Sequence, residues 1–306
     1  MMNKTIRIGT RDSELALWQA HTVEKRLNDL GYKTEIIAVK SQGDILLDKP
    51  LYELGITGIF TKTLDIAMIN GQVDIAVHSM KDVPTALPIG IVQAAVLERA
   101  NTLDILVHKG NLDFLNGEGT IATGSLRRQA QWLNKYPNHN VVDLRGNVNT
   151  RLQKLQDSDW NGAIFAAAGL ERINLKPSNY IDLDWMIPAP AQGAMVIVAM
   201  ANDEFCREAV SELNDIETEV CTHIERQFLK TLEGGCTAPI GALAVFIEDE
   251  IVFKGVLFSI DGKQKIEIEK TVPLQEWKKL GFASAQEILE NGGAELMREI
   301  KNNLKK

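Results

Sequence analysis

The sequence predicts an α/β fold for most of the chain, followed by a small α+β domain. Over residues 6–200, short apolar runs alternate with stretches in which apolar residues recur every three or four positions, as strands alternating with helices do. Over residues 251–271, two strand patterns flank Asp261-Gly262, a typical hairpin turn, and a helical pattern over 283–304, broken at Gly292-Gly293, follows them. Alternating strands and helices indicate a parallel sheet, whereas a hairpin with helices beside it indicates an antiparallel sheet.

The chain begins with a strand–helix–strand unit over residues 6–39. Apolar residues recur at steps of four and three over residues 16–30, and Gly31 is expected to end this helix. Such a unit implies a parallel pair of strands with a right-handed crossover. Arg11 and Ser13 lie where the first strand passes into the helix. Backbone N–H groups and the helix dipole favour an anion at such a place.

Residues 73–84 place polar side chains at the end of a short buried strand. His78, Ser79, Lys81 and Asp82 follow the apolar run directly. In open α/β sheets this edge is where ligands bind. A carboxylate beside an ammonium can hold a substrate that becomes cationic, or relay protons to it. Taken alone, a Lys-Asp pair at a strand end is more often solvated surface than catalytic.

One design, a strand followed by a polar tip and a helix start, occurs three times over residues 121–128, 141–151 and 163–172. Each tip carries arginine, which binds carboxylate or phosphate in a two-pronged geometry that lysine cannot copy. Any single arginine is explained as well by an ion pair with an acidic residue on a helix surface. The whole set indicates a site for a ligand with many carboxylates. Its members are Arg11, Arg127, Arg128, Arg145, Arg151 and Arg172.

Composition excludes several classes of function. Lys and Arg number 33 and Asp and Glu 41, which gives a net charge of −8 and disfavours general binding of nucleic acid or anionic membranes. The first residues contain no apolar signal segment, and the longest apolar run, residues 194–201, is too short to span a bilayer. The three cysteines are spaced for neither a disulfide framework nor a zinc site. We therefore expect a reduced, cytoplasmic protein without a metal.

The chain is expected to form three domains. Their bounds are residues 1–98 with 195–213, residues 99–194, and residues 214–306. Residues 188–193 form a rigid turn of the kind found at a crossover. The wholly apolar strand at 195–200 is suited to the middle of a parallel sheet. It either returns to the first domain or is the last strand of the second.

Cys236 lies between paired glycines and a proline turn, so no bulky neighbour in the sequence shields its sulfur. A cysteine has a reference pKa of about 8.5, and an electropositive cleft would increase its thiolate fraction. These residues alone leave open a loop thiol without a role. Cys206 and Cys221 fall within helix patterns and are expected to be small packing residues.

Several motifs taken together resemble the porphobilinogen deaminase, or hydroxymethylbilane synthase, family. They occur in the right order over nearly the whole chain, and their combination is specific although each one is weak. The motifs are His78-Ser79-Met80-Lys81-Asp82-Val83-Pro84, Ser125-Leu126-Arg127-Arg128, Leu144-Arg145-Gly146-Asn147 with Thr150-Arg151, Ala168-Gly169-Leu170, Gln192-Gly193-Ala194 and Glu233-Gly234-Gly235-Cys236.

The resemblance implies a transferase of tetrapyrrole (porphyrin, haem) biosynthesis. Such an enzyme joins four porphobilinogen molecules head to tail, releases ammonia and hydrolyses the product free as hydroxymethylbilane. It implies a dipyrromethane cofactor held by a thioether to the loop cysteine, here Cys236. It also implies two periplasmic-binding-protein-like domains enclosing a cleft, with the cysteine on the third domain.

The resemblance assigns the site residues as well. Asp82 would be the catalytic carboxylate, because each coupling passes through cationic pyrrole species that a carboxylate stabilises. The residues that would bind cofactor and substrate are Arg11, Ser13, Gln19, Asp44, Ser79, Lys81, Thr123, Ser125, Arg127, Arg128, Arg145, Arg151, Arg172, Gln192 and Gly193.

The sequence departs from the family pattern mainly in the loop over residues 42–61. Glycine content and length fit a mobile lid or an ordinary flexible connection equally well. Thr57 and Glu53 stand where lysine is common, so we expect intact chemistry with altered lid contacts. Two other classes stay open: a non-catalytic binding protein for a small polycarboxylate, and a cysteine-dependent hydrolase, which would need a histidine partner. A monomer with a small-molecule substrate is expected.

Overall fold

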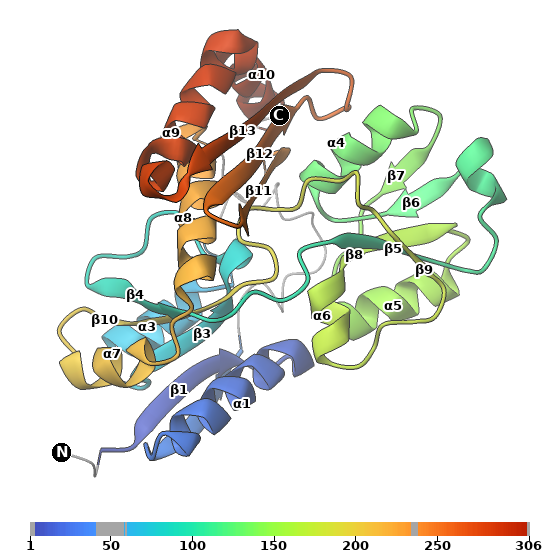
Figure 1. The fold of residues 1–306 in the computed structure, drawn as a ribbon. Coiled ribbons are helices and arrows are strands. Elements are labelled where there is room, and N and C mark those ends of the chain that lie inside the picture. Colours follow the sequence, from blue (N-terminus) through green and yellow to red (C-terminus); the bar gives the residue numbers. More distant parts are fainter. Residues whose placement is uncertain (1–3, 41–57, 59, 234–237, 305–306) are drawn as a thin grey trace. The chain divides into compact units, whose positions relative to one another are not determined.

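The computed structural model describes residues 4–40, 58, 60–233 and 238–304. The described residues divide into two compact units, 4–40, 58, 60–100 and 193–219 in the first and 101–192, 220–233 and 238–304 in the second. Figure 1 shows their helices and strands. Within the described ranges, no helix combines the length and the apolar character needed to cross a membrane.

The first unit is a five-stranded sheet with helices on both faces. Its strand order is β2-β1-β3-β10-β4, and β1 runs parallel to β2 and β3. The predicted strand–helix–strand unit at the start of the chain is therefore confirmed. The elements are β1 (Ile6–Arg11), α1 (Glu14–Asp29), β2 (Thr34–Val39), α3 (Lys62–Ile69), β3 (Ile75–Ser79), the 3-10 turn η2 (Met80–Asp82), β4 (Ile91–Val96), β10 (Met195–Met200) and α7 (Glu204–Ser211).

Residues 195–200 lie in this first sheet, between β3 and β4, and run antiparallel to both. The expected central position is confirmed, but the expected parallel surroundings are wrong. All residues of β10 except Met200 are buried. A strand covered on both faces is apolar throughout whichever way its neighbours run, so composition could not reveal the direction.

The second unit contains a sheet of the same plan, with the order β7-β6-β8-β5-β9. Strand β6 runs parallel to β7 and β8, whereas β5 runs antiparallel to β8 and β9. The three predicted strand–tip–helix segments are thus confirmed as neighbours. The elements are β5 (Asp104–His108), η3 (Asp113–Asn116), β6 (Thr120–Ala122), α4 (Leu126–Lys135), β7 (Asn140–Val142), α5 (Val148–Asp157), β8 (Gly162–Ala166), α6 (Ala167–Arg172) and β9 (Tyr180–Asp182).

The C-terminal part of the second unit is a three-stranded antiparallel sheet packed against helices. The predicted hairpin is confirmed, and Gly262 in its turn has a φ of +74°. The helix break predicted at the paired glycines is also confirmed, with Gly292 at a φ of +99°. The elements are α8 (Ile216–Thr231), β11 (Ile240–Ile247), β12 (Glu250–Phe258), β13 (Lys265–Pro273), η4 (Leu274–Glu276), α9 (Trp277–Ile288), the π-helical turn η5 (Leu289–Gly293) and α10 (Ala294–Asn303).

These sheets confirm the predicted fold class: two α/β sheets, followed by a small C-terminal part with a three-stranded antiparallel sheet and helices. Each has its own buried core. In the C-terminal core, the rings of Phe228 on α8 and Phe253 on β12 meet edge to face with centroids 5.2 Å apart. Strand β11 was not predicted, because its residues follow the glycine-rich segment without a turn signal of their own.

Candidate active site

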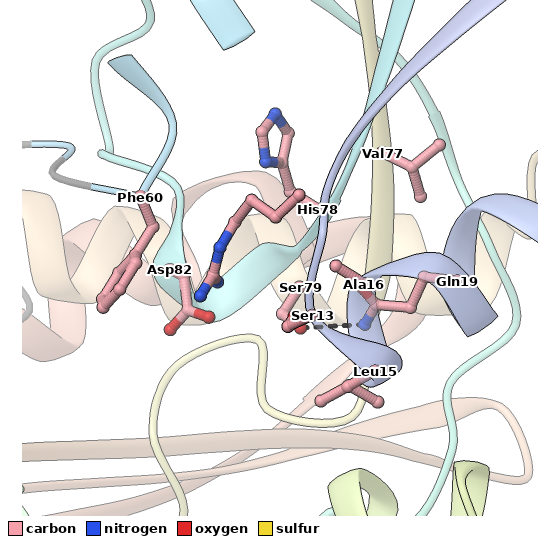
Figure 2. A pocket seen from close by; sticks show the side chains of 10 residues that line it. Ser13, Leu15, Ala16, Gln19, Phe60, Val77, His78, Ser79 and Asp82 are labelled. Carbon is pink, nitrogen blue, oxygen red and sulfur yellow. Dashed lines mark hydrogen bonds between the residues drawn. The ribbon is translucent and has the colours of Figure 1, made fainter. Parts of the chain in front are cut away.

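A small pocket opens where β1 and β3 end in the first unit (Figure 2). Its volume is about 60 Å³. It brings together five residues that the sequence predicts for the site, and Figure 2 shows Asp82 on the side of Phe60, with Gln19 on the side of Ser13 and Ser79. The five predicted residues are Arg11, Ser13, Gln19, Ser79 and Asp82.

Arg11 is the last residue of β1, and an aromatic ring orients its side chain. The guanidinium carbon lies 4.5 Å from the centre of the Phe60 ring. A cation over a ring face is stabilised by about 0.5–2 kcal/mol, depending on how far water is excluded. Arg11 therefore offers a held positive charge beside the pocket. Phe60 does not figure among the residues that the sequence predicts for the site.

Ser79 and Gln19 form a hydrogen-bonded pair within the pocket lining. Gln19 Nε2 donates to Ser79 Oγ over 2.8 Å, and the Gln19 side chain is buried. Because the hydroxyl oxygen accepts this bond, its own proton is left to donate elsewhere. Gln19 thus positions Ser79 as a hydrogen-bond donor for an anionic or carbonyl group.

His78 shares one face of the sheet with Arg11. Strands β1 and β3 pair through Gly9 and Ala76, and Arg11 and His78 each lie two residues further along. His78 is buried, and among the described residues its Nε2 has no hydrogen-bond partner. Burial, with a smaller effect from the Arg11 charge, lowers the pKa of His78 to about 4. The imidazole is therefore neutral near pH 7.

Asp82 ends a single 3-10 turn that follows β3 directly. The turn is fixed by two backbone hydrogen bonds, from Met80 N to Ala194 O at 3.0 Å and from Val83 N to Met80 O at 3.2 Å. The carboxylate is half-buried and lines the pocket. Lys81 is also half-buried, but it does not line this pocket.

In the second unit, two of the predicted arginines share one buried carboxylate. Arg127 Nη1 donates to Asp104 Oδ2 over 2.7 Å, and Arg128 Nε donates to Asp104 Oδ1 over 2.9 Å. Gln192 Nε2 donates to the same Oδ1 over 3.0 Å. All four side chains are buried. Asp104 is not among the residues that the sequence predicts for the site, and its one signal is a carboxylate directly before the apolar run at 105–107.

The remaining predicted arginines follow β7 and β8. Arg145 is buried, and this burial lowers its pKa. The charge of Asp143 raises the pKa again in part. Arg151 Nε donates to Gly146 O over 2.7 Å. Burial lowers the pKa of Arg172 to about 10, offset in part by Glu171. Because β6, β7 and β8 are parallel neighbours, the segments that carry these arginines begin at one edge of the sheet.

The predicted hydroxyl and glycine residues have local structural contacts. Thr123 Oγ1 accepts a hydrogen bond from Ser125 N at 3.3 Å. Ser125 Oγ caps α4 by accepting from Arg128 N at 3.4 Å. Gly193 has a φ of +86°, which favours glycine. Asp44 and Cys236, as well as Glu53 and Thr57, lie outside the described residues.

One further cluster contains atoms that metals bind. Asp74, Asp203 and Cys206 bring such atoms within 4.8 Å of one another. Arg7 already pairs with Asp74 at 2.8 Å, and Lys4 pairs with Asp203 at 2.8 Å. Burial raises the pKa of Cys206 to about 12, so its thiol stays protonated. These contacts fit an ion-pair network better than a metal centre.

Models of one protein family match almost the whole chain. The model described as "Porphobilinogen deaminase, dipyromethane cofactor binding domain" matches residues 6–208, and "Porphobilinogen deaminase, C-terminal domain" matches residues 219–290. The chain belongs to the porphobilinogen deaminase family. Pocket residues Arg11 and Asp82 and the cluster around Asp104 all fall within the first of these matches.

Individual relatives agree with the family models. A porphobilinogen deaminase of Chlorobium phaeobacteroides is 40% identical over 313 residues, covering 98% of this chain and 99% of the relative. One of Desulfitobacterium hafniense is 40% identical over 308 residues, covering 99% of both chains. Among solved structures, a periplasmic substrate-binding protein of an ABC transporter from Coxiella burnetii is 16% identical, with 70% of this chain and 94% of that chain covered and a TM-score of 0.44.

Proposed function

We propose that this chain joins four porphobilinogen molecules head to tail, releases ammonia at each addition and frees the product by hydrolysis as hydroxymethylbilane. Membership of the porphobilinogen deaminase family supports a transferase of tetrapyrrole biosynthesis. The observation that carries the proposal is the pocket that combines Arg11 with Asp82. A passive binder of anions would need the arginine but not the carboxylate.

Arg11 and Ser79 are suited to hold the substrate. Porphobilinogen carries an acetate and a propionate, and a hydrogen bond to a charged group contributes about 1.5–3 kcal/mol. Arg11 offers guanidinium N–H groups, and Ser79 offers the proton that Gln19 leaves unused. The neutral His78 adds no competing charge on the same face of the sheet.

Asp82 is suited to the chemical step, and we assign it as the catalytic residue. Loss of ammonia leaves positive charge on the pyrrole methylene group, and coupling passes through a protonated pyrrole. A carboxylate held in place stabilises such charge at little cost in reorganisation and accepts pyrrole N–H groups. The short turn that ends at Asp82 supplies this fixed position.

The described residues fit a cofactor that carries several carboxylates. In the described part of the chain, Arg127 Nε is a buried N–H group with no hydrogen-bond partner. Dipyrromethane, when bound, supplies the pyrrole end to which the first porphobilinogen is added. We assign its attachment to Cys236, on the motif Glu233-Gly234-Gly235-Cys236 in the sequence.

The other predicted residues complete the proposed binding set in two ways. Gln19, Ser125 and Gln192 make hydrogen bonds to the protein in the structure, so we assign them to holding other residues of the site. We assign the others to binding cofactor and substrate or to backbone shape: Ser13, Asp44, Lys81, Thr123, Arg128, Arg145, Arg151, Arg172 and Gly193.

We also propose that the protein is a cytoplasmic monomer with three domains, residues 1–98 with 195–213, residues 99–194 and residues 214–306. Its net charge of −8 supports a small-molecule substrate over nucleic acid. The buried thiols of Cys206 and Cys221 support a reducing compartment.

The intact mass of the purified protein tests the proposal. We expect the wild-type chain to carry an excess equal to two linked pyrrole units, and Cys236→Ser to lack it. Cys221→Ser, which removes a buried thiol of α8, is the matched control and should keep the excess. In the wild type, Asp82→Asn should lower kcat by about 100-fold or more. A wild-type chain still unmodified after incubation with porphobilinogen would instead support the binding-protein function.

A further inference from the structure

Helix α8 is followed by a glutamate in a backbone conformation that glycine adopts most readily. Glu233 comes two residues after the end of the helix and has a φ of +53°. A left-handed residue at this position is a common way to end a helix, and it is usually glycine. Glycine stands one residue later in the sequence, at Gly234. The conformation of Glu233 therefore indicates that a side chain is needed at this end of α8.

The C-terminal helix α10 holds the side chain of Glu233. Lys301 Nζ donates to Glu233 Oε2 over 2.5 Å. The Lys301 ammonium lowers the pKa of the Glu233 carboxyl, so the carboxylate is ionised near neutral pH. The residues directly before the two partners, Leu232 and Ile300, are buried in the same apolar core. Packing thus fixes both backbones, and the ion pair joins them just outside the core.

The ion pair lies where the helix hydrogen bonds end. Leu232 N donates to Phe228 O at 3.1 Å, and Glu233 N donates to Lys230 O at 3.0 Å in a tighter final turn. The Glu233 side chain is 76% exposed, so water and salt weaken the attraction of Lys301. An exposed pair of this kind stabilises a fold little, and its main effect is on the direction in which the chain leaves the helix.

That direction bears on Cys236, which follows Glu233 by three residues. Three residues span at most about 11 Å, so the place and conformation of Glu233 limit where the thiol can lie. The described chain resumes at Ala238, which is buried in the same core as Leu232. The segment that carries Cys236 therefore starts and ends at one core, and an ion pair holds its starting residue.

We propose that Lys301 is a positioning residue, which holds Glu233 in its left-handed conformation and so directs the chain from α8 towards the cofactor-attachment cysteine. This inference rests on the proposed function, because the attachment of a pyrrole to Cys236 gives the direction a chemical purpose. The family model for the C-terminal domain ends at residue 290, so Lys301 lies beyond the matched region.

Attachment depends on where the thiol lies. The sulfur bonds to the methylene carbon of porphobilinogen, the carbon–nitrogen bond breaks, and the amine leaves as ammonia with the thiol proton. Reacting atoms that are held near each other react faster than atoms that must first be brought together. A segment that leaves α8 in a fixed direction should therefore take up the first pyrrole faster than one that leaves it freely.

A double-mutant cycle on the rate of this loading tests the proposal. The full chain is produced without a supply of porphobilinogen and then incubated with it, and intact mass follows the gain of pyrrole units. Lys301→Met removes the charge, and Glu233→Gly removes the carboxylate but permits the positive φ. Each should slow loading about threefold, and the double variant should be no slower than either. Losses that multiply in the double variant, or no loss in either single variant, would overturn the proposal.

Three controls separate the ion pair from a general change in the C-terminal helices. Lys301→Arg keeps the charge and should load as fast as the wild type. Lys279→Met removes an exposed lysine of α9 and should also leave the rate unchanged. In 1 M salt, which screens exposed charges, the wild type and Lys301→Met should load at nearly equal rates. A threefold difference that persists in 1 M salt would overturn the role of the ion pair.

Hydrogen exchange separates failure of this inference from failure of the proposed function. A wild-type chain that stays unmodified in porphobilinogen would contradict the proposed function alone. The amide of Leu232 reports on the end of α8 without any cofactor, because it donates to Phe228 O. We expect this amide to exchange about threefold faster in Lys301→Met than in the wild type or in Lys279→Met. Equal exchange in Lys301→Met and the wild type would overturn the inference.

Discussion

Gln19 Nε2 donates a 2.8 Å hydrogen bond to Ser79 Oγ, so the first helix of the chain fixes a hydroxyl at the end of β3. The bond joins residues sixty positions apart in the sequence. It connects α1, which packs on one face of the sheet, with the strand end that leads to Asp82. The orientation of a pocket donor thus depends on how a helix packs.

Replacing Gln19 with methionine should weaken substrate binding through Ser79. The change keeps the length of the side chain but removes the donor, so the Ser79 hydroxyl can turn. We expect KM to rise about threefold to tenfold, which corresponds to the roughly 1 kcal/mol contributed by a neutral hydrogen bond, with a smaller change in kcat. Steady-state kinetics check this. Thr22→Val, on the next turn of α1, should leave KM unchanged.

His78 should make the folded protein sensitive to acid. Its pKa is about 4 in the folded protein against a reference value of 6.5, so the unfolded chain binds more protons between these values. The free energy of unfolding therefore falls as pH falls from 6.5 towards 4, by up to about 3 kcal/mol, and the contribution is complete above pH 6.5. Urea unfolding at several pH values should show that the free energy of unfolding depends less on pH in His78→Gln than in the wild type. The same substitution at the exposed His21 is the control, and a pH dependence that His78→Gln leaves unchanged would contradict the prediction.

Gly262, in the β12–β13 turn, should tolerate no side chain. A Cβ there would lie 2.3 Å from Ala130 O on α4, and Asn134 Nδ2 donates to Gly262 O at 2.8 Å. We expect Gly262→Ala to lower the free energy of unfolding by roughly 2–4 kcal/mol, because strain at positive φ adds to a clash with backbone. Gly31 has a positive φ with nothing within 4 Å, so Gly31→Ala should cost only about 1 kcal/mol. Denaturant unfolding measures both losses. If the two variants lost equal free energy of unfolding, the clash with α4 would not be the cause of the loss in Gly262→Ala.

Asn147 should stabilise the helix that carries Arg151. Its Oδ1 accepts a hydrogen bond from Thr150 N at 2.9 Å and caps α5. Asn147→Ala should lower the free energy of unfolding by about 1 kcal/mol, whereas Asn147→Asp, which keeps the acceptor, should cost much less. Thermal unfolding of the two variants checks this. A loss of similar size in both would argue against the cap.

The sequence by itself determined the elements whose signals are local. Apolar periodicity located α1, the strand at 75–79 and the three strand–tip–helix segments, and glycine chemistry located the hairpin turn at Gly262 and the helix break at Gly292. Motif spacing was enough to indicate the family and to place Arg11, Ser79 and Asp82 at a strand edge. These signals are local because side-chain period and turn conformation depend on residues a few positions apart.

Only the tertiary structure decided which distant groups meet. The apolar run at 195–200 fits a parallel and an antiparallel strand equally well, and only its pairing with β3 and β4 shows that it is antiparallel. Asp104 gives no signal in the sequence beside the arginines, because Arg127 and Gln192 lie 23 and 88 positions away from it. Burial, which removes water, then fixed how these charges share partners and how the pKa of His78 falls. Such contacts depend on packing between elements, which no local pattern encodes.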